Sequence, residues 1–377
     1  MDQKYHVAQP ENVKDSYGEY DTVDFVINMN GRCLLGGTTS LLMDVAVTNN
    51  ITLDEAGAPV NRVMYDGFVG AHSFVDTLTT SFSSSGTVEN IRFYPKYVSS
   101  KAKASLAKSD LYNSVHSVSG RTPSDDHADL MLKGSVTDST LAAYSAAQTK
   151  PMDACVKLDF CLNNTASNFT YSKTGDIRIS MTIPRSVYVL YGNNKIGDDK
   201  LISLTNLRLI YQTIAETDPK LPIVMRVETD LKQSIQSSNA VITTTAPIVA
   251  DCFYMTFIQQ NDESNTLVNG MENQRLPLIQ RVEFSFNDSL SSFITYEIEN
   301  EEELLSNYIK AVNKVSFDGE NNATLNTLAS NDSYGIGLAF GGFVDLRVNK
   351  ISVRIESQVL STNPYVAYCF FSGLVEM

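Results

Sequence analysis

The sequence has few positive charges and no concentrated basic segment. Its 377 residues contain 29 Lys and Arg against 43 Asp and Glu, which gives a net charge of −14. No block of five basic residues occurs, and Lys4, Lys14 and Arg32 are the only basic residues among the first 60. The chain therefore has no basic arm at its start, and we expect no direct binding to the phosphate backbone of a nucleic acid.

Long apolar runs and paired cysteines are also missing. No stretch of 18 apolar residues occurs, and the polar start MDQKYHVAQPENVKDSYGEYD has no signal-peptide core, so we expect a soluble chain that is not secreted. The cysteines are odd in number and lie in apolar strand patterns, which predicts reduced, buried thiols rather than disulfides; they are Cys33, Cys155, Cys161, Cys252 and Cys369.

Motifs for catalysis are absent. Neither GxSxG nor HExxH occurs, and the histidines are scattered without an HxH pair; they are His6, His72, His116 and His127. The glycine-rich run GIGLAFGG at 335–342 has Phe340 at the third glycine position of a dinucleotide loop and no βαβ context, so it predicts a turn and tight packing. We predict no catalytic residue, no cofactor-binding residue and no cofactor, and therefore no enzyme.

Three polar clusters allow a functional and a simpler interpretation, and we favour the simpler one for each. An acidic loop could hold a divalent cation, but a solvated loop is favoured; its residues are Asp125, Asp126, His127 and Asp129. Cys155 and Cys161 lack the further ligands of a zinc site, which favours reduced core or interface thiols. A basic helix could contact lipid or an acidic partner, but a solvated face or a contact between subunits is favoured; its lysines are Lys101, Lys103 and Lys108. We predict no metal site.

The sequence is rich in short strands. In RVEFSF, at 281–286, apolar and polar residues alternate, and FITYEIE, at 293–299, alternates again after a turn signal at 287–289, which predicts a hairpin. Asn300 can then cap a short helix with one apolar stripe, formed by Leu304, Leu305, Tyr308, Ile309 and Val312. The clearest strand pattern is DIRISMTIP at 176–184, where Ile177, Ile179, Met181 and Ile183 share one face.

The arrangement of these patterns predicts two domains. A chain of this length exceeds the usual size of a single core, and the densest turn signal near its midpoint is GNNKIGDDK at 192–200. We expect an N-terminal arm at 1–20, a first domain at 21–195 with a long loop excursion at about 100–150, and a second domain at 196–377. Strands separated by turns in both halves predict two β-sandwiches or barrels and argue against a βαβ fold.

The order of these elements resembles a known family. Together, LTNLRLIYQTI, TTTAPIVADCFYMTFIQQ, the 276–312 stretch and the apolar C-terminal strands are similar to the double jelly-roll major capsid proteins of DNA viruses. This hexon-like lineage includes proteins of adenovirus relatives, tectivirus-like phages, virophages and polinton-like viruses. The resemblance covers roughly residues 20–377. It implies an all-β fold of two jelly-roll barrels or sandwiches in tandem, with a few short helices in loops.

The same resemblance implies a structural function. Three chains would form a homotrimeric, pseudo-hexameric capsomer of an icosahedral shell, so the protein would be located in the virion after assembly inside the host cell. Its partners would be further copies of itself, penton and minor capsid or cement proteins, and an internal membrane if one lies beneath the shell. Two alternatives stay open: a penton, vertex or single jelly-roll capsid protein, and a β-sandwich module that binds carbohydrate or a receptor.

Overall fold

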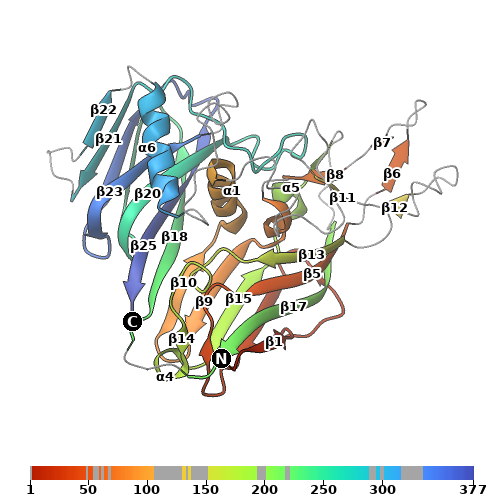
Figure 1. Cartoon of the computed structure of the whole chain (residues 1–377). Coiled ribbons are helices and arrows are strands. Elements are labelled where there is room, and N and C mark those ends of the chain that lie inside the picture. Colours follow the sequence, from red (N-terminus) through yellow and green to blue (C-terminus); the bar gives the residue numbers. More distant parts are fainter. Residues whose placement is uncertain are drawn as a thin grey trace.

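The computed structural model describes residues 2–47, 50–53, 59–60, 63–66, 69–105, 130–132, 135–136, 152–192, 201–216, 221–287, 294–297, 301–315 and 334–377. In these ranges the chain is built mainly from strands with a few short helices, as the alternating sequence patterns predict (Figure 1). No helix in the described ranges is both long and apolar enough to cross a bilayer.

The chain up to Ile214, here called the first half, forms two layers of strands. One layer contains seven strands, in the order β13 (Met152–Lys157), β5 (Ser40–Val47), β17 (Ile202–Ile214), β4 (Cys33–Leu34) and β14 (Phe169–Thr170), with β1 (Lys4–Ala8) and β2 (Tyr17–Gly18) also on β17. The other layer contains β10 (Gly86–Ile91), β9 (Thr77–Phe82), β15 (Ile177–Thr182) and β3 (Thr22–Ile27). Phe82 and Phe169 meet between the layers, with ring centroids 5.9 Å apart.

The second half repeats this two-layer arrangement. One layer has the order β23 (Ile336–Asp345), β20 (Val249–Gln259), β25 (Tyr365–Glu376) and β18 (Val224–Ile235). The facing layer has the order β19 (Asn239–Thr244), β24 (Ile351–Glu356), β21 (Arg281–Phe286) and β22 (Ile294–Glu297). β21 and β22 are the predicted hairpin, and Phe253 packs edge-on against Phe284 between the layers.

One layer from each half joins the other edge to edge. β10 and β18 run parallel and pair at a single position, Asn90 with Thr229, which links four strands of each half into one eight-stranded sheet. Beyond this position the two strands have no further paired residues. The joint between the halves therefore cannot depend on a strand ladder and needs other contacts.

The strand pairing disagrees with the boundary expected at residues 195 and 196. β17 lies after that boundary, yet it pairs with β5, β4, β1 and β2, all of which come from the first half. The change of sheet occurs between β17 and β18, after residue 216. The segment expected as an N-terminal arm, 1–20, contributes β1 and β2, which both pair with β17.

Two helices pack in the core. α6 (Glu301–Asn313) is the predicted amphipathic helix, and Leu304, Leu305, Tyr308 and Val312 are buried on its inner face. Asn300, its predicted cap, lies outside the described residues. A Cβ at Gly337 on β23 would come within 2.9 Å of the Tyr308 Cα, so the glycine lets α6 approach the sheet. Gly335 and Gly337 are therefore tightly packed as predicted, whereas Gly341 and Gly342 at the other end of the run are exposed and have nothing within 4 Å of a built Cβ. From Ile336 onward the run forms a strand and not the predicted turn.

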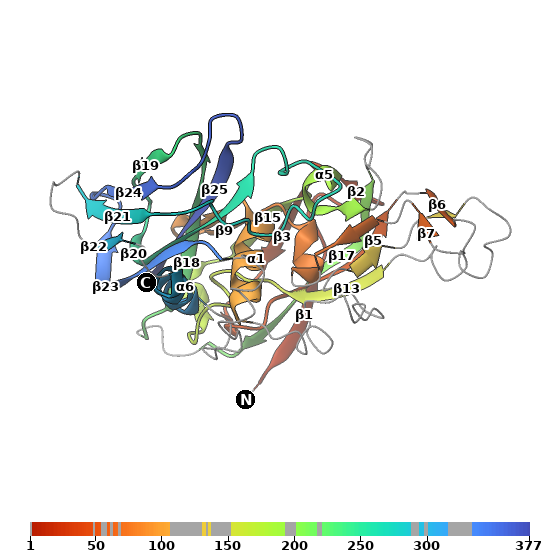
Figure 2. The ribbon, with the colours of Figure 1, turned by 90° about the horizontal axis from the view of Figure 1, so that it is seen from above.

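The other long helix, α1 (Tyr94–Ser105), lies between the two halves in both views (Figures 1 and 2). Shorter elements complete the described chain: β8 (Val63–Tyr65), β11 (Leu130–Leu132) and β16 (Tyr191–Gly192) in one small sheet, β6 (Asn50–Leu53), β7 (Pro59–Val60) and β12 (Ser135–Val136) in another, and the helices η1 (Gly70–Phe74), α4 (Tyr171–Thr174) and α5 (Ser186–Val189).

The seam between the halves as candidate functional site

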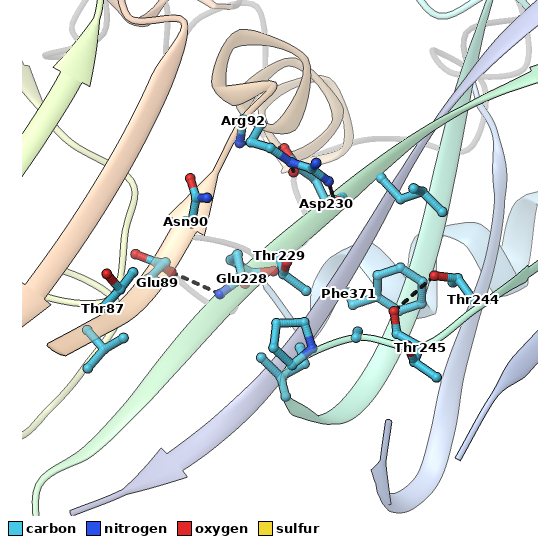
Figure 3. Close-up of a pocket in the computed structure, with 15 residues that line it drawn as sticks. Thr87, Glu89, Asn90, Arg92, Glu228, Thr229, Asp230, Thr244, Thr245 and Phe371 are labelled. Atoms are coloured by element: carbon cyan, nitrogen blue, oxygen red, sulfur yellow. Dashed lines mark hydrogen bonds and ion pairs between the residues drawn. The ribbon is translucent and has the colours of Figure 1, made fainter. Parts of the chain in front are cut away.

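The contact between the two halves concentrates the buried charged groups of the chain. We call it the seam: residues 86–105 and 159–167 of the first half against residues 224–235 and 260–276 of the second. Its centre is the point where β10 and β18 diverge (Figure 3). Charged side chains are seldom buried unless they have partners, so we expect each buried charge at the seam to have an ion-pair or hydrogen-bond partner.

Two carboxylates replace the missing strand ladder. The backbone N–H of Glu228 on β18 donates to Glu89 on β10 over 2.9 Å (Figure 3). In the reverse direction, the backbone N–H groups of Arg92 and Phe93 donate to Asp230 on β18, each over 2.7 Å. The Arg92 side chain adds an ion pair of 3.0 Å to the same carboxylate. Each half thus supplies an acid that accepts backbone hydrogen bonds from the other half.

A buried ion pair lies on the first-half side of the seam. Lys101 Nζ of α1 lies 2.7 Å from one Asp159 oxygen and 2.8 Å from the other, and neither side chain has exposed surface. The hydroxyl of Tyr97 lies 3.0 Å from the same Nζ, and the side-chain amide of Asn164 donates to Asp159 over 2.7 Å. The hydrogen bonds to the Asp159 carboxylate all end on one oxygen, Oδ1, and within the described residues Oδ2 is compensated by the charge of Lys101 alone.

Further polar contacts attach α1 to the 260–276 loop of the second half. Ser99 Oγ donates to the Met271 carbonyl over 2.7 Å, and Lys103 Nζ donates to the same carbonyl over 3.1 Å. Lys103 also pairs with buried Asp66 at 2.8 Å, and Asn269 of the loop donates to that aspartate. α1 is consequently buried nearly all round although half of its residues are polar.

Burial changes the acidity of the seam carboxyl groups. It raises the pKa of Glu89 from 4.5 to about 7, although backbone donors from Cys161 and Glu228 counteract part of the shift. It also raises the pKa of Glu228 well above its usual value, opposed by the positive charge of Lys101. The Glu228 carboxyl accepts a hydrogen bond from Ser372 over 2.6 Å, which joins β18 to β25.

A cavity of about 440 Å³ opens where β10 and β18 diverge (Figure 3). Residues 87–90 and 92 line one side, and residues 228–231 and 244–248 line the rest together with Phe371. Its lining contains no histidine or cysteine, and the described part of the chain has no group of three residues suited to a metal ion. The ion pairs and hydrogen bonds of the seam therefore indicate a structural role, in which they attach one half of the chain to the other.

The structure overturns the solvated interpretation of the basic helix. Lys101 is fully buried against Asp159, and only 12% of the Lys103 side chain is exposed. The helix begins at Tyr94, with Pro95 in its first turn. Lys108 and most of the 100–150 excursion lie outside the described residues.

The cysteine prediction is partly wrong. All five thiols are free, and Cys33, Cys161, Cys252 and Cys369 are buried as expected, but Cys155 is exposed. Cys155 and Cys161 therefore do not share a buried face. Cys161 instead belongs to the seam, because its backbone N–H donates to Glu89 over 2.8 Å.

The remaining candidates form no shared site in the part of the chain that the structure describes. His6 stacks on Tyr211 away from the seam. His72 is buried at the border of the seam, with its Nδ1 2.8 Å from the hydroxyl of the seam residue Tyr94. The acidic loop of Asp125, Asp126, His127 and Asp129 falls outside the described residues, as does His116. Sequence reasoning did not single out any of the acids at the seam. The one available signal was a charged residue within each strand pattern, which is equally typical of a solvent face.

Comparison with known proteins gives a clear result for the fold. No protein-family model matches the sequence, and no curated protein matches it. Among solved structures, the Faustovirus major capsid protein is similar with a TM-score of 0.61 at 9% identity, covering 100% of this chain and 90% of that one. VP54 of PBCV-1, fitted into a reconstruction of the virophage Sputnik, gives 0.59 at 10% identity, covering 100% of this chain and 94% of that one.

The mavirus major capsid protein is similar as well, with a TM-score of 0.51 at 11% identity, covering 99% of this chain and 90% of that one. All three likenesses extend over both halves and the seam, so they concern the complete two-layer pair and not one sandwich. The predicted all-β fold of two tandem jelly rolls is thus confirmed, and the chain has the double jelly-roll fold of viral major capsid proteins.

Proposed function

We propose that this protein is a structural major capsid protein that forms pseudo-hexameric homotrimeric capsomers of an icosahedral DNA-virus shell. The observation that carries the proposal is the extent of the structural likeness: the whole chain aligns with 90% of the Faustovirus major capsid protein. A chain with this role needs shape and contacts and no reactive site, which agrees with a seam made of buried ion pairs and hydrogen bonds. In this proposal the protein is no enzyme.

The geometry of two rolls in one chain supports a trimer. Three chains with two similar rolls each give six barrels around a threefold axis, which can occupy a near-hexagonal lattice, and closed rings repeat one contact patch in every copy. We assign residues 2–216 to the first roll, because β1 and β2 belong to its seven-stranded layer, and residues 221–377 to the second, because the sheets change partners between β17 and β18.

The partners and location follow from the same role. The proposed partners are further copies of this chain in the trimer and in neighbouring capsomers, penton and minor capsid proteins, and a membrane where one underlies the shell. The net charge of −14 supports a protein that does not contact the packaged genome directly. The proposed location is the virion shell, assembled inside the host cell without secretion.

Native mass tests the proposal most directly. Light scattering behind a sizing column should give one species at three times 41.6 kDa for the purified chain, and electron microscopy of expressed particles should show capsomers with a sixfold outline. A five-fold species would contradict the proposal and favour a vertex protein. A monomer over a wide concentration range would contradict it as well and favour a binding module.

A further inference from the structure

A second cavity, of about 220 Å³, lies further along the seam beside Phe93 and Lys232. Both rolls contribute to it, since Phe93 and Lys96 come from the first roll and Lys232 and Tyr368 from the second. Phe93 and Tyr368 meet edge to face at 5.1 Å, and Tyr188 adds a third aromatic wall. The cavity has room for one ring-sized molecule and offers it apolar faces for stacking.

The cavity contains an unusual lysine. Lys96, in the first turn of α1, is only 5% exposed, and its Nζ lies 5.4 Å from the centre of the Tyr368 ring. In the described part of the chain, the Nζ has one hydrogen-bond partner, the Glu272 carbonyl at 3.3 Å, and no carboxylate within ion-pair distance. Lys101 and Lys103 on the same helix each have such a carboxylate. Among the described residues, Lys96 is therefore a buried lysine at this cavity that makes no direct ion pair.

The surroundings of Lys96 favour the neutral amine. Burial, assisted by the positive charge of Lys103, lowers the pKa of Lys96 to about 7. The negative charges of three carboxylates oppose this shift; they belong to Glu263, Asp66 and Glu272. A desolvated lysine beside another cation is the arrangement that makes an amine nucleophilic near neutral pH. Asp76 lines the same cavity, and its pKa is raised to about 6 by burial and by the charge of Asp230. An amine and a weak acid thus border one aromatic space.

We propose that this cavity binds small aromatic aldehydes and that Lys96 joins them covalently as an imine. The neutral amine adds its lone pair to the carbonyl carbon, and one proton passes from the nitrogen to the carbonyl oxygen to give a carbinolamine. Asp76 donates a proton to the hydroxyl group, which leaves as water while the C=N bond forms. The remaining proton of the nitrogen then returns to the Asp76 carboxylate. Amine and aldehyde give imine and water, so no oxidant or reductant is needed.

Site-resolved labelling tests this proposal. The full-length protein is incubated with benzaldehyde at pH 6.5, the imine is reduced with cyanoborohydride, and each lysine is followed by peptide mass spectrometry. A lysine with the ordinary pKa near 10.4 is neutral in only about one molecule in 10⁴ at this pH, whereas an amine with a pKa near 7 is neutral in roughly one in four. We expect Lys96 to be labelled at least about a hundredfold faster than exposed Lys14 in the same digest.

Matched controls separate the cavity from general amine chemistry. A pyrene aldehyde, too large for the cavity, should label the α-amino group and leave Lys96 unmodified. Lys96→Arg keeps the positive charge and should lose the label, and Asp76→Asn should slow labelling several-fold at the same site. Labelling of Lys96 no faster than Lys14, or equal labelling by the bulky aldehyde, would overturn the proposal. Because wild-type sites are compared within one digest, the result does not depend on the variants or on the oligomeric state.

Discussion

The buried ion pair between Lys101 and Asp159 gives a quantitative test of how the seam is held. Replacing Lys101 by Met removes the cation but keeps a long apolar side chain, so Asp159 stays buried without its charge partner. Both side chains are fully buried, with Nζ 2.7 and 2.8 Å from the two carboxylate oxygens. Removing one member of such a pair costs about 3–5 kcal/mol, because the other charge is left uncompensated in the interior.

An exposed pair in the same chain supplies the control. Lys14 and Asp21 also lie 2.7 Å apart, but 47% and 31% of their side chains are exposed. Exposed pairs of this kind contribute about 0–1 kcal/mol, since water and salt screen them. Lys14→Met therefore makes the same chemical change at a similar distance and should alter the free energy of unfolding by less than about 1 kcal/mol.

Urea unfolding at fixed chain concentration, followed by circular dichroism and tyrosine fluorescence, measures both variants. The double variant Lys101→Met, Asp159→Asn removes both charges and keeps an acceptor for Asn164, so it should recover most of the loss. A loss for Lys101→Met no larger than for Lys14→Met would refute the reasoning. A double variant as unstable as the sum of its single changes would refute it too, because it would show that the two charges are not coupled.

Three further predictions concern other parts of the fold. Gly337→Ala should cost about 1–3 kcal/mol, because its Cβ would lie 2.9 Å from the Tyr308 Cα, while Gly341→Ala, with nothing within 4 Å, should be neutral in the same thermal melt. Asp230→Ala should cost about 2–5 kcal/mol in urea unfolding, since two backbone N–H groups lose their acceptor; an unchanged midpoint would contradict the role of this carboxylate in the seam. The pKa of Glu89 is raised from 4.5 to about 7, so the folded chain binds a proton that the unfolded chain releases between these values. The contribution of Glu89 to the free energy of unfolding should therefore rise by up to roughly 3 kcal/mol as the pH falls from 7 to 4.5. Glu89→Gln should flatten this part of the curve of unfolding free energy against pH. Equal slopes for the variant and the wild type would contradict the prediction.

The strands were predictable because their signal is local. In β15, Ile177, Ile179 and Met181 are buried while Arg178 points outward, as the period of two requires. The hairpin of β21 and β22 and the inner face of α6 were predictable for the same reason, since neighbouring residues alone carry the pattern. The domain boundary was not, because a turn signal at 192–200 cannot tell which sheet the next strand joins.

The buried acids of the seam could not be predicted from the sequence, because of the same period of two. Along β18, Glu228 and Asp230 fall on the polar phase of the strand, which predicts a face in water. In the structure the other roll covers the middle of this face, so Glu228 and Asp230 are buried, while Lys232 and Ser234 further along the same face stay exposed. The prediction of a solvated Lys101 was wrong for the same reason. Its partner Asp159 is 58 residues away in the sequence, and no local pattern indicates such a pairing.

Directional bonds at the seam bear on the proposed assembly. Apolar packing alone tolerates small sliding of one surface over another, whereas the bonds from Glu89 to the Glu228 N–H and from Asp230 to the Arg92 N–H hold at one alignment of β10 and β18. A slip by one residue would leave these carboxylates and N–H groups buried without partners, at a cost of about 1–3 kcal/mol for each unsatisfied group. The angle between the rolls is therefore fixed within each chain. In a shell of the proposed kind, six rolls from three chains need that angle to be the same in every copy, because any spread would accumulate around the ring and prevent its closure.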